Sequence, residues 1–257
     1  MNKTKIEWCD STWSPITGCW HDCPYCYARR IANRFGVDIS FMKISKPVEL
    51  LRPVLDENGN RIPFPTMFIP TFHRYRLGEY ANKKGRTIFV CSMADLFGEW
   101  IPDEWISAVF DDCRNASQHR YLFLTKNPAR YIALAEKGLL PKEDNMWYGT
   151  SVPTPKTEFF WADGYQTFIS IEPVLEDFGS DDGAMSISKA KWIIVGAETG
   201  NRKEKVIPKP VWIDHIRAVC NREHIPLFMK NSLLPVVGEE NMVREFPWGK
   251  ERYGVRQ

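Results

Sequence analysis

The chain has 257 residues, of which 44% are hydrophobic and 26% charged, and its formal net charge is +2. This profile is typical of a soluble globular protein with a full core. The small charge argues against a dedicated nucleic-acid coat protein, although a local basic groove would still fit it. The apolar runs reach only strand length, so no membrane span is expected. Residues 1–5 carry no signal-peptide core, so we expect a cytoplasmic, reducing location.

Apolar runs rich in β-formers alternate along the chain with segments of helical period. The expected strands are apolar almost throughout, as in parallel strands buried on both faces, and cover residues 87–93, 121–126, 146–152, 167–173, 192–198 and 225–230. The expected helices cover residues 26–35, 103–116, 128–137 and 210–220. Six βα units plus a seventh strand fit this alternation. It predicts an α/β fold, a partial (β/α)6 TIM-like barrel of parallel strands, in a single domain over residues 1–257.

Two segments interrupt the alternation. Residues 41–86 contain five prolines and several basic side chains, and we interpret them as an insertion after the first βα unit, either a lid or a solvated connection. Residues 177–188 are polar and glycine-containing, which predicts a flexible loop.

The carboxyl ends of the expected strands carry polar side chains. In a barrel, function collects at this end, although each group alone could simply cap the following helix. Six such endings in succession favour a site there, because polar groups in a barrel mouth need partners. They are Ser92, Met93 and Asp95, then Thr125 and Lys126, Thr150 and Ser151, Ser170 and Glu172, Glu198, and Lys230 with Asn231.

Cys19, Cys23 and Cys26 form a C-x3-C-x2-C motif. Thiolates are the ligands of iron–sulfur clusters, and three of them would leave one iron of a [4Fe–4S] cluster open. Zinc is the alternative, with Cys9 or His21 as a fourth ligand, but the chain has no second C-x2-C pair. Seven cysteines, an odd number, argue against a disulfide framework.

The motif, with Tyr25 before its last cysteine and a helix after it, resembles the signature of radical SAM enzymes. The resemblance implies that Cys19, Cys23 and Cys26 bind the cluster and that S-adenosylmethionine binds the open iron. Reductive cleavage would then yield a 5′-deoxyadenosyl radical, with the cofactor supplying the difficult chemistry. A reductant such as flavodoxin or ferredoxin is the implied partner.

A second resemblance extends over most of the chain. It is similar to the phage-associated three-Cys-motif family, although many members space the first two cysteines more widely. The motifs that carry it are Glu7-Trp8, Thr12-Trp13-Ser14-Pro15, Gly18-Cys19, residues 89–97, 124–128 and 149–152, Ser170-Ile171-Glu172-Pro173 and residues 195–200. One branch with the compact motif is the queuine lyases, which implies release of the 7-deazaguanine base queuine from queuosine 5′-phosphate, a step of queuine salvage.

The resemblance also implies roles for further residues. The expected cofactor contacts are Tyr25, Ser92, Met93, Lys126, Thr150, Ser151 and Glu172. Carboxylates would read the N–H donors of a deazaguanine and tryptophans would form a stacking wall, so the expected substrate residues are Glu7, Trp8, Asp10, Trp13, Glu198 and Lys230. Any of four cations would suit a substrate phosphate: Arg74, Arg76, Arg202 or Lys230.

In the implied mechanism a hydrogen is removed from the substrate ribose and the sugar radical expels the base. Cys9 or Cys91 would be the catalytic hydrogen donor, although both also fit as small core residues. The alternative function is a radical SAM enzyme of nucleic acid, either DNA photoproduct repair or RNA modification, with the basic insertion as its groove. The low net charge favours the free nucleotide.

Overall fold

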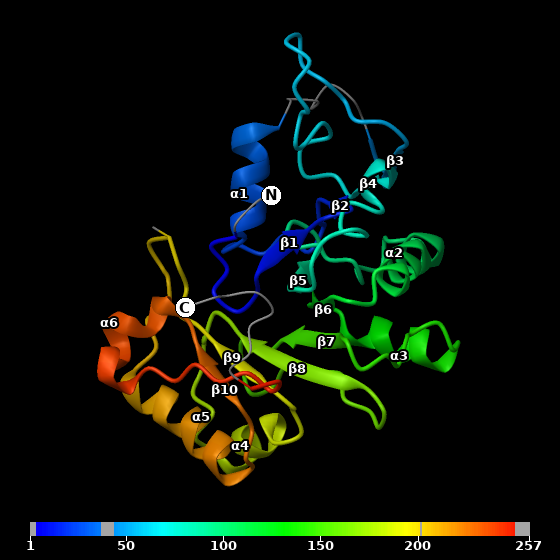
Figure 1. The fold of residues 1–257 in the computed structure, drawn as a ribbon. Helices are drawn as coiled ribbons and strands as arrows, with labels where there is room; N and C mark the ends of the chain where they lie inside the picture. The colour runs from blue at the N-terminus through cyan, green and yellow to red at the C-terminus, as the bar shows by residue number, and fades with distance from the viewer. Residues whose placement is uncertain (1–3, 37–43, 201, 250–257) are drawn as a thin grey trace.

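The computed structural model describes residues 4–36, 44–200 and 202–249. Its centre is a curled sheet of seven parallel strands (Figure 1), which confirms the predicted partial TIM-like barrel. In spatial order the strands are β1 (Ser11–Trp13), β5 (Thr87–Val90), β6 (Arg120–Thr125), β7 (Met146–Ser151), β8 (Gln166–Ile171), β9 (Ile193–Val195) and β10 (Leu227–Met229). Within the described residues β10 does not pair with β1, so the barrel is open.

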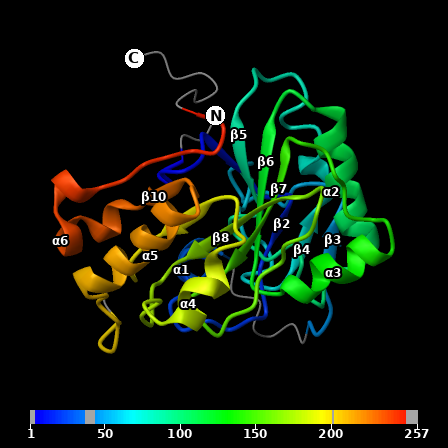
Figure 2. The ribbon, with the colours of Figure 1, turned by 90° about the horizontal axis from the view of Figure 1, so that it is seen from below.

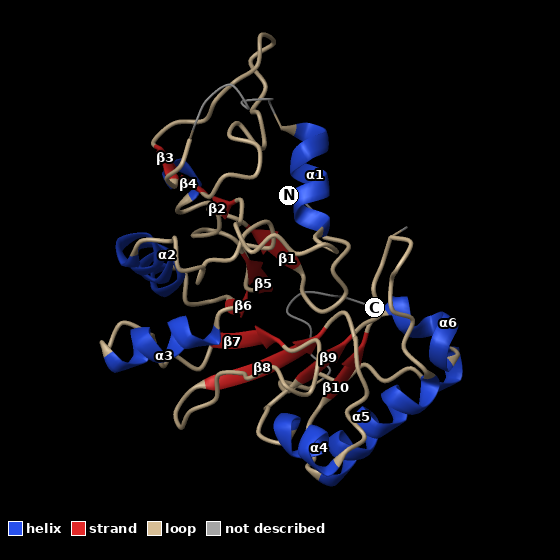
Figure 3. Cartoon of the chain, turned by 180° about the vertical axis from the view of Figure 1, so that it is seen from behind, coloured by secondary structure: helices blue, strands red, loops and turns tan. Residues whose placement is uncertain are grey.

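Helices cover the outer face of this sheet (Figures 1 and 2). They are α2 (Asp103–Asn115) and α3 (Pro128–Glu136) against β5–β7, and α4 (Asp181–Ile187) and α5 (Pro210–Arg222) against β8–β10. The short α6 (Leu234–Val237) follows β10, as Figure 3 shows. In α5, Ile213, Ile216 and Val219 bury one face at helical spacing, as the sequence predicts. No helix in the described ranges is long and apolar enough to cross a membrane.

The predicted flexible loop at residues 177–188 is wrong, because most of it forms α4. Ser180 begins this helix by accepting a hydrogen bond from the backbone N–H of Gly183 at 3.0 Å. Asp181 and Asp182 occupy the first turn, where negative charge is favourable. The polar composition that suggested a loop is therefore the composition of a helix start.

The insertion builds a small sheet beside the barrel. β2 (Ile16–Thr17) pairs antiparallel with β4 (Thr71–His73), which pairs in parallel with β3 (Val48–Leu50). A single turn, η1 (Arg74–Arg76), follows β4. The insertion then contacts β1, since the Tyr80 hydroxyl donates to the carbonyl of Thr12 at 2.9 Å. Residues 41–43 of the predicted insertion lie outside the described residues.

Aromatic side chains fill the inner face of the half-barrel. They come from alternate positions of the strands, among them Phe89, Trp147, Phe168 and Phe228, and they pack around the fully buried Trp192. The tail at residues 243–245 pairs with β10 and brings Phe246 and Trp248 onto this cluster. One end of the inner face is thus filled by aromatic rings.

Candidate active site at the carboxyl ends of the strands

The cysteine-bearing segment between β2 and α1 (Tyr27–Phe35) starts at Gly18, where a side chain would be strained. Gly18 has φ of +86°, and a Cβ there would lie 2.2 Å from the carbonyl oxygen of Ile69. Its backbone N–H donates to Met93, and the N–H of Cys19 donates to Phe68. These contacts hold the start of the segment against the turn that follows β5.

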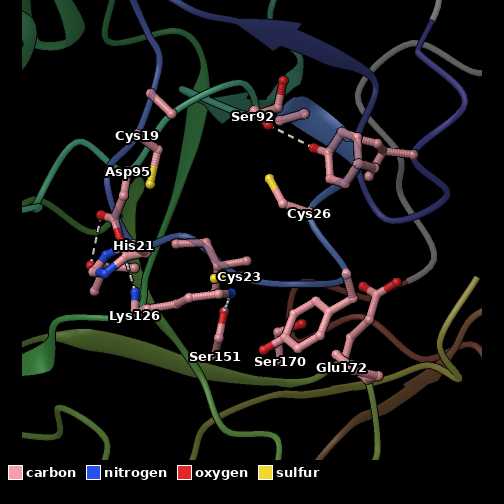
Figure 4. A pocket seen from close by; sticks show the side chains of 18 of the residues that line it. Cys19, His21, Cys23, Cys26, Ser92, Asp95, Lys126, Ser151, Ser170 and Glu172 are labelled. Atoms are coloured by element: carbon pink, nitrogen blue, oxygen red, sulfur yellow. Dashed lines mark hydrogen bonds and ion pairs between the residues drawn. The ribbon is translucent and has the colours of Figure 1, made fainter. Parts of the chain in front are cut away.

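The three cysteines face one pocket. Their sulfur atoms surround a common open space in Figure 4, and all three residues line the same cavity. Cys26 also caps α1, because its Sγ accepts the backbone N–H of Arg29 at 3.3 Å. Helix α1 thereby fixes the last cysteine, and residues 68–69 and 93 fix the first.

The strand ends supply most of the remaining polar lining of this cavity, called here the cysteine pocket. It includes residues within two positions of the ends of five different strands: Ser92, Lys126, Ser151, Ser170, Glu172 and Lys230. In a parallel barrel all these ends meet at one rim. The sequence-based expectation that the strand-end groups converge is therefore correct for these residues.

Asp95 connects the cysteine segment to β6. Its carboxylate accepts hydrogen bonds from the Thr125 hydroxyl at 2.7 Å and from the backbone N–H of Lys126 at 2.9 Å. His21 Nε2 lies 2.7 Å from the same carboxylate. Only 5% of Asp95 is exposed, so the hydrogen bonds that this carboxylate accepts come from protein groups. It thus ties the loop between Cys19 and Cys23 to the strand that carries Lys126.

Two lysines cross the pocket. The ammonium of Lys126 lies 3.3 Å from the Ser151 hydroxyl and 5.8 Å from the centroid of the Tyr25 ring. Lys230 forms an ion pair with Glu172. Burial raises the pKa of Tyr25, and the charge of Lys126 opposes that shift. The pocket therefore holds one lysine whose charge faces a hydroxyl and a ring, and one whose charge meets a carboxylate.

Glu198 is held at the pocket wall by Arg202. Both carboxylate oxygens accept hydrogen bonds from the guanidinium, at 2.7 and 2.8 Å. These bonds lower the pKa of Glu198 below its ordinary value. The carboxylate is therefore ionised at neutral pH and already engaged with a cation.

The cysteine pocket gathers many of the predicted site residues. Besides the cysteines, the predicted residues that line it are Tyr25, Ser92, Lys126, Ser151 and Glu172 from the cofactor set, and Trp8, Glu198 and Lys230 from the substrate set. Trp8 is only 3% exposed, and its ring packs 4.6 Å from Phe89, centroid to centroid. Its buried indole N–H has no hydrogen-bond partner in the described part of the chain.

Other predicted residues do not line this pocket. Met93 and Trp13 line a second hollow, and Trp13 donates its indole N–H to the carbonyl of Arg76 at 3.0 Å. Thr150 accepts from the backbone of Phe160. Of the remaining carboxylates, Asp10 accepts the N–H of Thr87, and Glu7 accepts the N–H of Asn231 and pairs with Arg244.

The two thiols predicted as hydrogen donors also lie outside the pocket lining. Burial raises the pKa of Cys9 and of Cys91 to about 12, so each thiol keeps its proton at neutral pH. Cys91 is 2% exposed and belongs to the core under the sheet. Their role as donors stays a prediction.

The residues present fit a cluster held by three thiolates. The pocket volume is about 210 Å³, against roughly 10–15 Å³ for one water molecule, so it accepts a group larger than a single ion. The three cysteines would bind such a group through their sulfur atoms. The unpartnered indole N–H of Trp8 is available to donate a hydrogen bond to a polar ligand. Within the described ranges, no three His, Cys, Asp or Glu side chains gather closely enough to hold one metal ion. A four-iron cluster does not require this, because each thiolate would bind a different iron.

Sequence reasoning did not assign the His21–Asp95 contact. The two residues lie 74 positions apart, and His21 was considered only as a zinc ligand. The Tyr27 hydroxyl, which donates to the Ser92 carbonyl at 2.6 Å, was also missed. Asp95 did carry a signal, because it follows a strand in the polar series at the barrel mouth. Nothing local to His21 or Tyr27 indicates these partners.

Comparison with known proteins places the chain in a family. Residues 3–239 match the model described as protein of unknown function (DUF5131), and the chain belongs to this family. No curated protein matches the sequence.

Solved structures share the fold at low sequence identity. A double mutant of spore photoproduct lyase with bound AdoMet and dinucleoside spore photoproduct is 9% identical, with a TM-score of 0.50 over 89% of this chain and 78% of that chain. A single mutant of the same lyase is 11% identical, with a TM-score of 0.48 over the same shares. Spore photoproduct lyase is a radical SAM enzyme, and the likeness is one of fold.

Proposed function

We propose that this chain is a radical SAM enzyme, with Cys19, Cys23 and Cys26 as ligands of a [4Fe–4S] cluster. The observation that carries the proposal is the gathering of these three thiols, with no fourth cysteine, in a pocket at the carboxyl ends of a parallel half-barrel. When bound, the cluster and S-adenosylmethionine would supply a 5′-deoxyadenosyl radical. The fold of spore photoproduct lyase, solved with AdoMet, supports this assignment.

The protein's own part is to bind and position. Burial raises the pKa of Cys19 to about 12 and also raises that of Cys23, so these thiols must lose protons when iron binds. Lys126 and Ser151 form a polar pair suited to a carboxylate or ribose hydroxyl. The Glu172–Lys230 pair offers one acceptor and one donor on the opposite wall.

For the substrate, we infer a nucleotide joined to a second one, as in a nucleic acid. The lyase of similar fold binds a dinucleoside. Of the residues expected to read a deazaguanine, Glu7, Asp10 and Trp13 do not line the cysteine pocket, and Glu198 is engaged by Arg202. We therefore propose an enzyme that acts on nucleic acid, by repair of a DNA photoproduct or by RNA modification.

Release of queuine from queuosine 5′-phosphate is the second candidate. It is supported by the family resemblance and by Trp8 and Lys230, which do line the pocket. Both candidates need a base and a phosphate-bearing sugar to reach the same rim, so they share the cluster and differ in what lies beyond it.

Anaerobic purification and metal analysis test the radical SAM assignment. We expect iron and sulfide in a ratio that fits one four-iron cluster per chain, and 5′-deoxyadenosine after addition of S-adenosylmethionine and reductant. Cys23→Ser should lose most of the iron and all of this product. Cys220→Ala is the matched control, because Cys220 is buried in α5 and outside the pocket.

Zinc in place of iron, or full turnover by Cys23→Ser, would contradict the assignment. The substrate is tested separately with the loaded enzyme. Turnover of a dinucleotide photoproduct or an RNA oligonucleotide supports the first candidate, and release of base from queuosine 5′-phosphate supports the second.

A further inference from the structure

A second hollow lies on the other side of the turn after β5. It opens between β1 and the insertion, which Figure 1 shows in cyan next to the barrel. Its volume is about 600 Å³, within the roughly 300–1,000 Å³ of small-molecule sites. Ser92 lines both this hollow and the cysteine pocket. The wall between the two is therefore the turn that carries Ser92 and Met93.

The hollow is lined by more positive than negative side chains. Its cations are Arg61, Arg76 and Lys83, and its single carboxylate belongs to Glu79. Glu79 forms an exposed ion pair with Arg61, in which Arg61 Nη1 lies 3.4 Å from Glu79 Oε1. The hollow thus contains two cationic side chains, Arg76 and Lys83, whose charges no neighbouring carboxylate of the described residues neutralises.

Arg76 is the best placed of these cations. Its guanidinium is half-buried and donates to the backbone carbonyl of Ser14 at 2.8 Å. This contact and a second one, with the Pro63 carbonyl, hold the side chain in position. Its charge stays uncompensated, since no carboxylate of the described residues pairs with it. Burial, aided by the charge of Arg76, lowers the pKa of the neighbouring His73 to about 3, so that histidine is neutral.

The other cations considered for a phosphate differ from Arg76 in this respect. Each of them forms an ion pair with a carboxylate: Arg74 with Glu49, Arg202 with Glu198 and Lys230 with Glu172. A guanidinium held by carbonyls, with free donor positions and a nearby ammonium, suits the oxygen atoms of a phosphate.

We propose that this second hollow binds the phosphate group of a nucleotide-sized ligand, with Arg76 and Lys83 as its cationic contacts. Hydroxyls of the same wall, among them Ser14 and Ser92, are available as further donors. The site goes beyond the proposed radical chemistry, because it needs no cluster. Since Ser92 belongs to both walls, a ligand bound here would be separated from the cysteine pocket by the turn after β5.

Titration calorimetry with inorganic phosphate, and separately with adenosine 5′-monophosphate, tests the proposal on the full purified chain. We expect both probes to bind, with affinity that falls as sodium chloride rises. Arg76→Gln should weaken binding about tenfold or more, as the loss of a charge-assisted hydrogen bond implies. Lys83→Gln, which removes an exposed side chain, should weaken it less and guards against misfolding of the Arg76 variant.

Two further variants decide where the phosphate binds. Arg52→Gln removes an exposed charge of the insertion outside the hollow and should leave the affinity unchanged. Lys126→Gln removes a charge of the cysteine pocket and should leave the affinity for inorganic phosphate unchanged, because Lys126 does not line the second hollow. The proposal fails if neither probe binds at millimolar concentration, if Arg76→Gln and Lys83→Gln bind like the original chain, or if Lys126→Gln abolishes binding. None of these results depends on iron or on turnover.

Discussion

The two ends of the inner face of the half-barrel are built on different principles. At the carboxyl end, charged and hydroxyl groups from five strands face a cavity, and several of them are oriented by hydrogen bonds or ion pairs. Toward the other end, Trp192 is fully buried among aromatic rings, with Phe168 at 5.6 Å and Trp248 at 5.2 Å between centroids. The side chains at the first end are positioned by hydrogen bonds and ion pairs, and those at the second end by the packing of rings.

Trp8 stands at the boundary between the two. Its ring packs on Phe89 and Trp192, yet the residue also lines the cysteine pocket. Trp192 donates its indole N–H to Glu245, whereas that of Trp8 has no partner in the described part of the chain. The contrast shows that aromatic rings form the floor of the pocket, while polar groups form its rim.

Replacement of Trp192 by alanine should produce the largest loss of stability. We expect the free energy of unfolding to fall by about 3–5 kcal/mol, because a large buried ring is deleted and leaves a cavity. Urea denaturation measures this. Trp161→Ala is the matched control, since Trp161 is 49% exposed, and it should cost far less. A loss at Trp192 no greater than at Trp161 would overturn the division between the two ends.

The sequence predicts the fold better than the site. Apolar runs such as residues 121–126 and 146–152 identified strands that the structure confirms as β6 and β7, because burial on both faces leaves a local mark. Trp8 and Trp13 were both assigned to a stacking wall for the substrate base, but they line different cavities. Chain proximity could not distinguish them.

Long-range contacts explain the rest of the difference. The three cysteines proposed as cluster ligands stand out in the sequence because all three lie on one short segment. The contact between Asp95 and His21 depends on how the turn after β5 packs against the segment after β2. No local sequence pattern predicts this packing. The helix α4 was missed for the opposite reason, since a local signal, the Ser180 cap, was interpreted as loop composition.

Asp95→Asn should have the next largest effect and should act at the polar end. The amide replaces one acceptor oxygen by a donor, so a buried backbone N–H loses its acceptor. It is that of Lys126 if the amide nitrogen takes the place of Oδ2, and that of Phe97 if it takes the place of Oδ1. An unsatisfied buried group costs about 1–3 kcal/mol. We also expect less iron per chain, because the segment between Cys19 and Cys23 loses its anchor.

Thermal melting and iron content of the reconstituted protein check this prediction together. Asp112→Asn is a suitable control, because Asp112 also accepts a backbone N–H, that of Gly78, but belongs to α2 and does not line the cysteine pocket. It should lower stability slightly and leave the iron content as it is. Equal iron in both variants would show that Asp95 stabilises the fold without positioning the cysteines.

Glu198→Gln should have the smallest effect, and one that depends on pH. Its hydrogen bonds with Arg202 lower the pKa of Glu198 below its ordinary 4.5. A carboxyl whose pKa is lower in the folded state contributes stability above its unfolded pKa and loses that contribution as the pH falls through its folded pKa. The variant should therefore melt a few degrees lower than the original chain at pH 7, and this difference should shrink below about pH 4.5. Trp192→Phe removes no ionisable group, so its melting difference should stay constant over the same range. If both differences are independent of pH, the charge of Glu198 does not stabilise the rim, and shape alone accounts for both ends of the barrel.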